Sequence, residues 1–216
     1  MGLIGTDTIC ANEVAKAAAA ICGGIVAPHI AYTPAPFNTG FPGTVSVTPD
    51  LLENLILQVC QGLLTQGFRG VFVVNGHGAN LAPAHAAASA LPKGVVRIQS
   101  WWDPDPVAKL RNAHFGEWEG MHATPSEVAI TQALHGRKPA GVAKEPPKPL
   151  SQAYIAEHSG DRHGPPDEHR AQFPDGRVGS HSDLATPELG QEILDAAAKA
   201  LAADFERFSA RRSKPG

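Results

Sequence analysis

The stretch that most constrains this fold runs from Val71 to Asn80 and reads Val-Phe-Val-Val-Asn-Gly-His-Gly-Ala-Asn. Its valine-rich start predicts a buried strand, Asn75-Gly76 ends that strand, and the alanine-rich run beyond it indicates a helix. His77 is therefore expected just past the carboxyl end of a strand, at the edge of an open α/β sheet where ligands bind. Taken alone, His77 also fits a turn histidine that is hydrogen-bonded to a carbonyl group.

The rest of the chain alternates helix and strand signals, which predicts one α/β domain over residues 1–216. Residues 104–121 and 136–182 are expected to be irregular, and a loop as long as the second usually serves as a functional cover. Residues 211–216 are expected to be a frayed tail. The expected helices cover residues 6–21, 49–66, 81–91, 124–134 and 186–208, and the expected strands cover residues 25–28, 71–74 and 95–99, with a short extended piece at 43–47.

Composition narrows the class of protein. The net charge of -3 is spread along the chain and aromatic residues are few, which argues against nucleic-acid and membrane-surface partners. The odd set of Cys10, Cys22 and Cys60 has no paired spacing, which predicts reduced thiols and no structural zinc knot. Without a leader or a long apolar run, the sequence predicts a cytoplasmic protein.

Four side chains could do chemistry together. Asp7, His77 and Glu127 each lie where a loop meets a helix, so they could converge on one edge of the sheet. Nitrogen and carboxylate ligands suit zinc, manganese or iron(II), and His122 could move a proton. Each also has a simpler interpretation, because Asp7 could cap a helix, Glu127 could complete a capping box with Thr124, and His122 could be a loop histidine.

Further residues near these positions have two interpretations each. Trp101, Trp102 and Trp118 could wall a pocket, or they could belong to the core or to an oligomer interface. Glu117 and Glu119 could support metal ligands through hydrogen bonds, although solvated loop charges are the simpler expectation.

Several motifs, taken in order, resemble the creatininase (creatinine amidohydrolase) family. Asn75 to Asn80 resembles the family's Asn-Gly-His-Gly-Gly-Asn, and His122 to Glu127 resembles His-Ala-Gly-x-x-Glu with the same spacing. Gly5-Thr6-Asp7 is similar to the Gly-Thr-Asp that follows the family's first strand. Shorter matches are Phe41-Pro42-Gly43-Thr44, Phe173 to Gly179 and Ala185 to Glu188.

The resemblance implies a three-layer α/β/α sandwich with a mainly parallel sheet, assembled as a homo-oligomer and often a hexamer. It implies a metal-dependent hydrolase of non-peptide, often cyclic, amide C–N bonds, with a small-molecule amide as substrate and zinc, manganese or iron(II) as cofactor. Carried over by motif, Asp7 bridges two metals, His77 and Glu127 are further ligands, and His122 serves proton transfer.

The chain also departs from the family pattern. The family's first strand ends in Ser-x-Glu-x-His-Gly, whose Glu and His are metal ligands, whereas only four residues precede Gly5 here. We therefore expect at most one well-held metal and reduced activity, or else a non-catalytic binding or assembly subunit. A longer natural protein that carries the full site is a third interpretation. Gly78-Ala79 stands where creatininase proper has Tyr-Glu, which argues against creatinine as the substrate.

Overall fold

A computed structural model describes residues 3–136, 144–160 and 162–211 of the chain. The predicted tail at 211–216 lies almost wholly outside the described residues. The α-helices are α1 (Thr6–Cys22), α2 (Pro49–Thr65), α3 (Leu81–Ser89), α4 (Asp105–His114), α5 (Pro125–His135), α6 (Gln152–Glu157), α7 (Pro166–Gln172) and α8 (Pro187–Ala210). The strands are β1 (Val71–Asn75) and β2 (Val96–Ser100), and short 3-10 turns cover Pro36–Gly40, Gly78–Asn80, Gly116–Trp118 and Ser182–Leu184.

The sheet consists of β1 and β2, which run parallel with Val71 opposite Val96 and Asn75 opposite Ser100. The amide of Val71 donates to the carbonyl of Val95, and the carbonyl of Asn75 accepts from Trp101. Because neighbouring residues of a strand point their backbone groups to opposite edges, Phe72 and Val74 present theirs to the other edge of β1. No described strand pairs with that edge.

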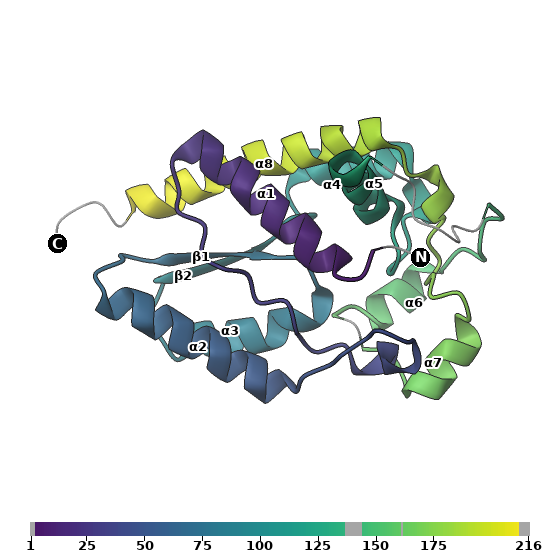
Figure 1. The fold of residues 1–216 in the computed structure, drawn as a ribbon, viewed down its shortest axis with the longest axis horizontal. Coiled ribbons are helices and arrows are strands. Elements are labelled where there is room, and N and C mark those ends of the chain that lie inside the picture. The colour runs from purple at the N-terminus through teal and green to yellow at the C-terminus, as the bar shows by residue number, and fades with distance from the viewer. Residues whose placement is uncertain (1–2, 137–143, 161, 212–216) are drawn as a thin grey trace.

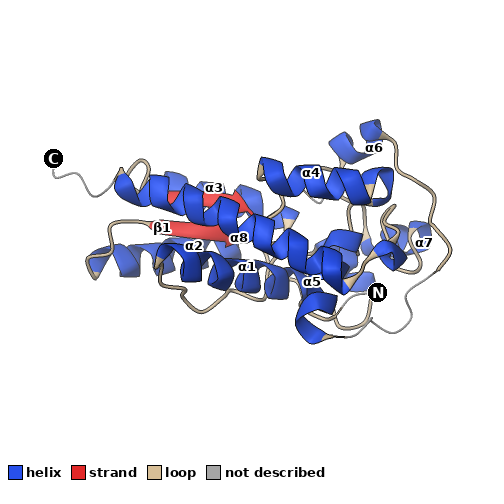
Figure 2. Ribbon diagram, turned by 90° about the horizontal axis from the view of Figure 1, so that it is seen from above, coloured by secondary structure: helices blue, strands red, loops and turns tan. Residues whose placement is uncertain are grey.

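Helices cover both faces of this sheet, which confirms the predicted three-layer α/β/α arrangement. In Figure 1, α1 and α8 lie on one side of β1 and β2, and α2 and α3 lie on the other. The view from above in Figure 2 shows α4, α6 and α7 gathered toward the end where α5 lies. None of the described helices is long and apolar enough to cross a membrane.

Successive side chains of β1 point alternately into two hydrophobic cores. Phe72 and Val74 pack against the layer that holds Val14 and Ile193, whereas Val71 packs against the layer that holds Ile56. The first layer joins α1, α4, α5 and α8, and the second joins α2 and α3 to the sheet. This alternation is the period of a strand buried on both faces.

Proline after a threonine begins three of the helices. Thr48, Thr124 and Thr186 are N-caps whose side chains accept hydrogen bonds from backbone amides in the first turn. The capping interpretation of Asp7 was wrong, because the N-cap of α1 is Gly5, in a left-handed conformation with φ 82°. Asp7 therefore sits inside the first turn, where its carboxylate does not cap the helix.

Three further predictions need correction. Residues 25–28 form no strand, because no described strand lies beside them to complete a ladder. Residues 104–121 are not wholly irregular, since α4 buries Val107 against the core and a 3-10 turn follows it. Residues 136–182 likewise contain α6 and α7, although residues 137–143 and 161 lie outside the described part.

Candidate functional site

A large cavity of about 1230 Å³ lies along the unpaired edge of β1, between α1, α2 and the extended segment 24–33. Asp7, His77, His122 and Glu127 all line it. Much of its remaining wall is apolar and exposed, which explains why large hydrophobic side chains such as Ile25, Tyr32, Val59 and Phe68 are not buried.

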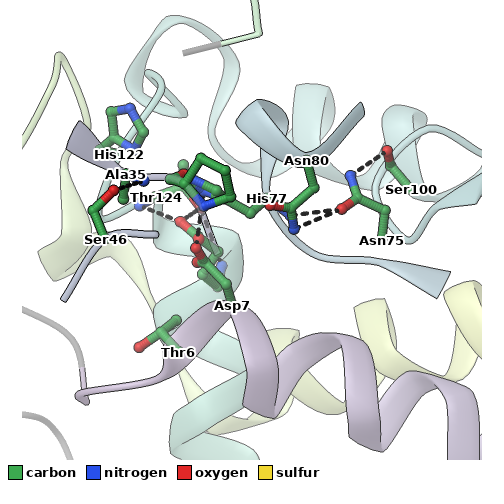
Figure 3. Close-up of polar contacts among 12 residues, drawn as sticks. Thr6, Asp7, Ala35, Ser46, Asn75, His77, Asn80, Ser100, His122 and Thr124 are labelled. Atoms are coloured by element: carbon green, nitrogen blue, oxygen red, sulfur yellow. Dashed lines mark hydrogen bonds and ion pairs between the residues drawn. The ribbon is translucent and has the colours of Figure 1, made fainter. Parts of the chain in front are cut away.

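Asp7 and His77 are in direct contact at the carboxyl end of β1 (Figure 3). His77 Nδ1 lies 3.0 Å from Asp7 Oδ2, and His77 Nε2 lies 2.9 Å from the carbonyl oxygen of Pro34. A carbonyl can only accept a hydrogen bond, so Nε2 carries a proton. The contact with Asp7 then requires a proton on Nδ1, a proton on Asp7 Oδ2, or a cation bound to both atoms.

The loop after β1 is held rigidly around His77. The backbone amide of His77 donates to Asn75 Oδ1 at 3.2 Å, and Asn80 Nδ2 donates to the same oxygen at 3.2 Å. Asn75 Nδ2 in turn donates to Ser100 Oγ on β2. A Cβ atom at Gly76 would overlap the carbonyl oxygen of Asp7, so only glycine lets α1 approach this loop closely.

Glu127 completes the capping box that its spacing predicted, and it also lines the cavity. Its Oε2 accepts from the backbone amide of Thr124 at 2.9 Å and Thr124 Oγ1 accepts from the Glu127 amide, so the capping box is present. The same carboxyl group also shares a hydrogen bond with Asp7. Capping thus fixes the side chain of Glu127 at the wall of the cavity.

The two carboxyl groups affect each other's protonation. Burial, together with the negative charge of Asp7, raises the pKa of Glu127 to about 8. Burial opposes ionisation of Asp7 as well, but the hydrogen bond and charge of His77 outweigh it and hold the pKa of Asp7 below its ordinary value. The pair therefore carries one proton at neutral pH, which a cation could replace.

His122 precedes α5 and is one of the residues that line the cavity. Its Nε2 lies 3.1 Å from Nε2 of His163, and its ring lies 5.0 Å from that of Phe37. The following residue, Ala123, has φ 54°, a conformation that L-residues rarely adopt. The structure thus brings all four predicted site residues to one cavity, while their roles stay a prediction.

Glu119 is not a solvated loop charge, contrary to the simpler expectation. It is only 9% exposed, and its Oε1 accepts from Arg111 Nε at 3.0 Å and from Ser126 Oγ. Because Ser126 lies in the first turn of α5, this network braces the turn that carries Glu127. Glu117 is exposed, as expected.

The tryptophans do not wall this cavity. Trp101 is 1% exposed in the core, and Trp102 packs edge-on against it. Trp118 contacts His181. The partners that sequence reasoning missed are the Pro34 carbonyl and His163, since both come from loops without a local signal of their own.

The donor types fit a divalent metal. An imidazole nitrogen and a carboxylate oxygen 3.0 Å apart can bind one ion, and a histidine that binds through Nδ1 usually donates Nε2–H to a backbone carbonyl, as His77 does to Pro34. As they stand, no three His, Cys, Asp or Glu side chains of the described residues form a ready-made metal cluster. Hydrogen bonds occupy the positions that metal bonds would take.

Comparison with known proteins identifies the family. The family model described as "Creatininase: Creatinine amidohydrolase" matches residues 1–205. The chain belongs to the creatininase family. Family membership confirms the resemblance that the motifs indicated, and the chain has the hydrolase fold of that family.

Solved creatininases share the fold. A creatinine amidohydrolase structure superposes with a TM-score of 0.75 at 21% identity, covering 98% of this chain and 84% of that one. A manganese form of creatininase gives a TM-score of 0.71 at 21% identity, covering 94% and 84%. A zinc–zinc form of a creatininase variant gives 0.66 at 19% identity, covering 94% and 83%. At these identities the likeness shows the fold alone.

One relative is named as a peptidase and not as a creatininase. The mycofactocin precursor peptide peptidase of Mycolicibacterium smegmatis is 36% identical over 115 residues, which are 52% of this chain. The match spans 45% of that protein's length. The family therefore includes a protein that acts on a peptide.

Proposed function

We propose that this protein is a metal-dependent hydrolase of an amide C–N bond. The observation that carries the proposal is the contact of Asp7 Oδ2 with His77 Nδ1 at 3.0 Å, at the wall of a large cavity. A carboxylate at the cavity wall and a buried imidazole that is already bonded through its other nitrogen make a site suited to a cation.

Asp7, His77 and Glu127 would hold the ion, and zinc, manganese or iron(II) suits this donor set. When bound, such a metal lowers the pKa of water and polarises the amide carbonyl. The protein's own residues do the rest. Glu127 gives up its proton when the site is loaded, the Pro34 carbonyl holds the ring of His77 in place, and His122 carries a proton to the leaving nitrogen.

We propose a small, non-peptide amide as the substrate. The motif resemblance to enzymes of cyclic amides supports this choice, and the Gly78-Ala79 pair argues against creatinine itself. The relative that acts on a precursor peptide makes a short peptide the main competitor. The chain's apolar cavity wall would favour a substrate with an apolar portion.

One experiment tests the function. The full chain, stripped with a chelator and reloaded with zinc or manganese, is assayed on lactams, formamides and short peptides, and its metal content is measured. We expect at most one metal per chain and turnover of a lactam or formamide that His77→Ala abolishes. Equal activity of wild type and His77→Ala would refute the proposal, and cleavage of peptides alone would replace the substrate class.

The second candidate is a binding or assembly subunit without catalysis. The absence of a three-donor cluster among the described residues favours it. On that account, the chain would bind neither zinc nor manganese after purification under mild conditions. Metal content therefore separates the two candidates before any substrate is known.

We further propose a cytoplasmic homo-oligomer with neither nucleic acid nor membrane as partner. Leu51 and Leu55, one helical turn apart on α2, are 56% and 41% exposed and do not line the cavity. An exposed apolar stripe of this kind is typical of an interface. Light scattering coupled to gel filtration tests the oligomer, including the hexamer that the family resemblance implies.

A further inference from the structure

Rings from four segments meet beside His122. Phe37, which is 2% exposed, lies 5.0 Å from His122, 4.6 Å from His163 and 5.0 Å from His169, measured between ring centroids. His163 also stacks on His158 at 5.3 Å. The segment that precedes α7 thus places the imidazole of His163 next to His122, the proposed proton carrier.

The contact between His122 and His163 is made through specific atoms. Their Nε2 atoms lie 3.1 Å apart, which is a hydrogen-bond distance. Two neutral imidazoles in this contact share one proton, so one Nε2 is a donor and the other an acceptor. The contact therefore fixes opposite tautomers on the two rings.

We propose that His163 is a positioning residue, accepting the Nε2 proton of His122 so that His122 exchanges protons with the substrate through Nδ1. This inference rests on the proposed function for the role of His122, and on geometry for the contact itself. With Nε2 held by His163, only Nδ1 can gain a proton while the contact stands. The resulting imidazolium still donates from Nε2, so His163 stabilises the protonated ring during transfer.

Packing supports an orienting role for His163. His158 stacks on its ring, Phe37 lies against it at a tilt of 49°, and His169 lies 4.8 Å away at a tilt of 54°. A ring enclosed on several sides has few rotamers to choose from. His163 therefore holds His122 in one orientation at little further cost in side-chain entropy.

Two substitutions of His163 separate the role of its Nε2 acceptor from the role of its aromatic packing. His163→Phe keeps an aromatic ring against Phe37 and His158 but removes the acceptor. His163→Gln restores a polar group at the end of the side chain. His158→Phe serves as the matched control, because it keeps an aromatic ring stacked on His163 and leaves the Nε2 contact between His122 and His163 in place.

The first measurement needs no substrate. Long-range proton–nitrogen NMR spectra of the full chain, recorded without added metal and with Zn²⁺, report which nitrogen of His122 carries the proton. We expect the Nε2–H form in the wild type and in His158→Phe, and a mixture of tautomers in His163→Phe. An Nδ1–H form in the wild type, or a His122 spectrum that His163→Phe leaves unchanged, overturns the proposal.

The second measurement uses the lactam or formamide that the zinc-loaded wild type turns over fastest. We expect His163→Phe to lower kcat about 10- to 100-fold, with KM nearly unchanged, and His163→Gln to recover part of the loss. A loss confined to KM, or equal kcat in the wild type and His163→Phe, contradicts positioning. If the wild type turns over nothing, the hydrolase proposal fails, and the NMR result alone decides the role of His163.

Discussion

His77 is held between Asp7 and Pro34, with Nδ1 3.0 Å from the Asp7 carboxylate and Nε2 2.9 Å from the Pro34 carbonyl oxygen. The ring therefore cannot rotate without breaking a hydrogen bond. Such a fixed imidazole offers one defined atom, Nδ1, to a metal ion. This relationship makes the proposed metal binding testable residue by residue.

Replacing His77 by alanine should remove the metal. The remaining carboxylates lack the nitrogen ligand, so we expect the affinity for Zn²⁺ to fall at least about 100-fold. Zinc titration against a competing chelator dye measures this change. His85→Ala, an exposed histidine on α3, is the matched control and should bind zinc like the wild type. Unchanged zinc affinity in His77→Ala would exclude His77 as a ligand.

Glu127 should make the metal-free protein sensitive to alkaline pH. Its pKa is about 8 in the folded protein against an ordinary value of 4.5, so between these values the folded state binds more protons than the unfolded state. The free energy of unfolding therefore falls as the pH rises through this window. At lower pH Glu127 is protonated in both states and adds no pH dependence. The free energy of unfolding of Glu127→Gln minus that of the wild type should therefore increase between about pH 5 and about pH 9. The increase should be on the order of a few kcal/mol.

Urea unfolding of chelator-treated protein across this pH range checks the prediction. Glu117→Gln is the control, because Glu117 is exposed in a nearby loop and should follow the wild-type curve. A stability difference between Glu127→Gln and the wild type that does not change with pH would contradict a protonated Glu127.

Metal binding should release protons. An ion that replaces the hydrogen bond between Asp7 and Glu127 displaces the proton that Glu127 holds at neutral pH, so zinc affinity should rise with pH up to about 8. Calorimetric titration in buffers of different ionisation enthalpy counts the protons. Glu127→Gln should release about one proton fewer than the wild type near neutral pH. An equal count in both proteins would show that Glu127 is not a ligand.

Arg111→Ala should destabilise the turn that carries Glu127. The side chains of Arg111 and Glu119 are 22% and 11% exposed, and removing Arg111 leaves a buried carboxylate bonded to Ser126 without its counter-charge. We expect a loss of about 2 kcal/mol, below that of a fully buried pair. Lys16→Ala breaks an exposed ion pair with Glu13 and should cost less than about 0.5 kcal/mol. Equal losses in the two variants would contradict a bracing role for Glu119.

Local signals predicted the helices well where caps and periodicity agreed. Thr124 and Glu127 form the predicted capping box, and β1 lies where four apolar residues predicted it. The helix α4 was missed because, apart from Val107, few of its residues are apolar and prolines stand at its start. The strand at 25–28 was wrongly predicted, because pairing depends on a neighbouring chain segment and not on local composition.

The sequence was enough to predict which residues meet at the candidate site, but not which other groups they contact. Placing Asp7, His77 and Glu127 at helix starts near one sheet edge was enough to predict that they meet. The positions of Pro34 and His163 depend on long loops, whose path no periodic pattern encodes. Glu119 was misjudged because burial of a charge depends on partners distant in space, here Arg111.

The backbone groups of Phe72 and Val74 at the outer side of β1 also govern how this protein behaves in concentrated solution. A strand edge that no described strand pairs, beside exposed apolar side chains such as Val59 and Phe68, is a template on which another extended chain can add. Its tendency to aggregate is thus set by how this side of β1 is shielded, and the small net charge of -3 provides little electrostatic repulsion against it.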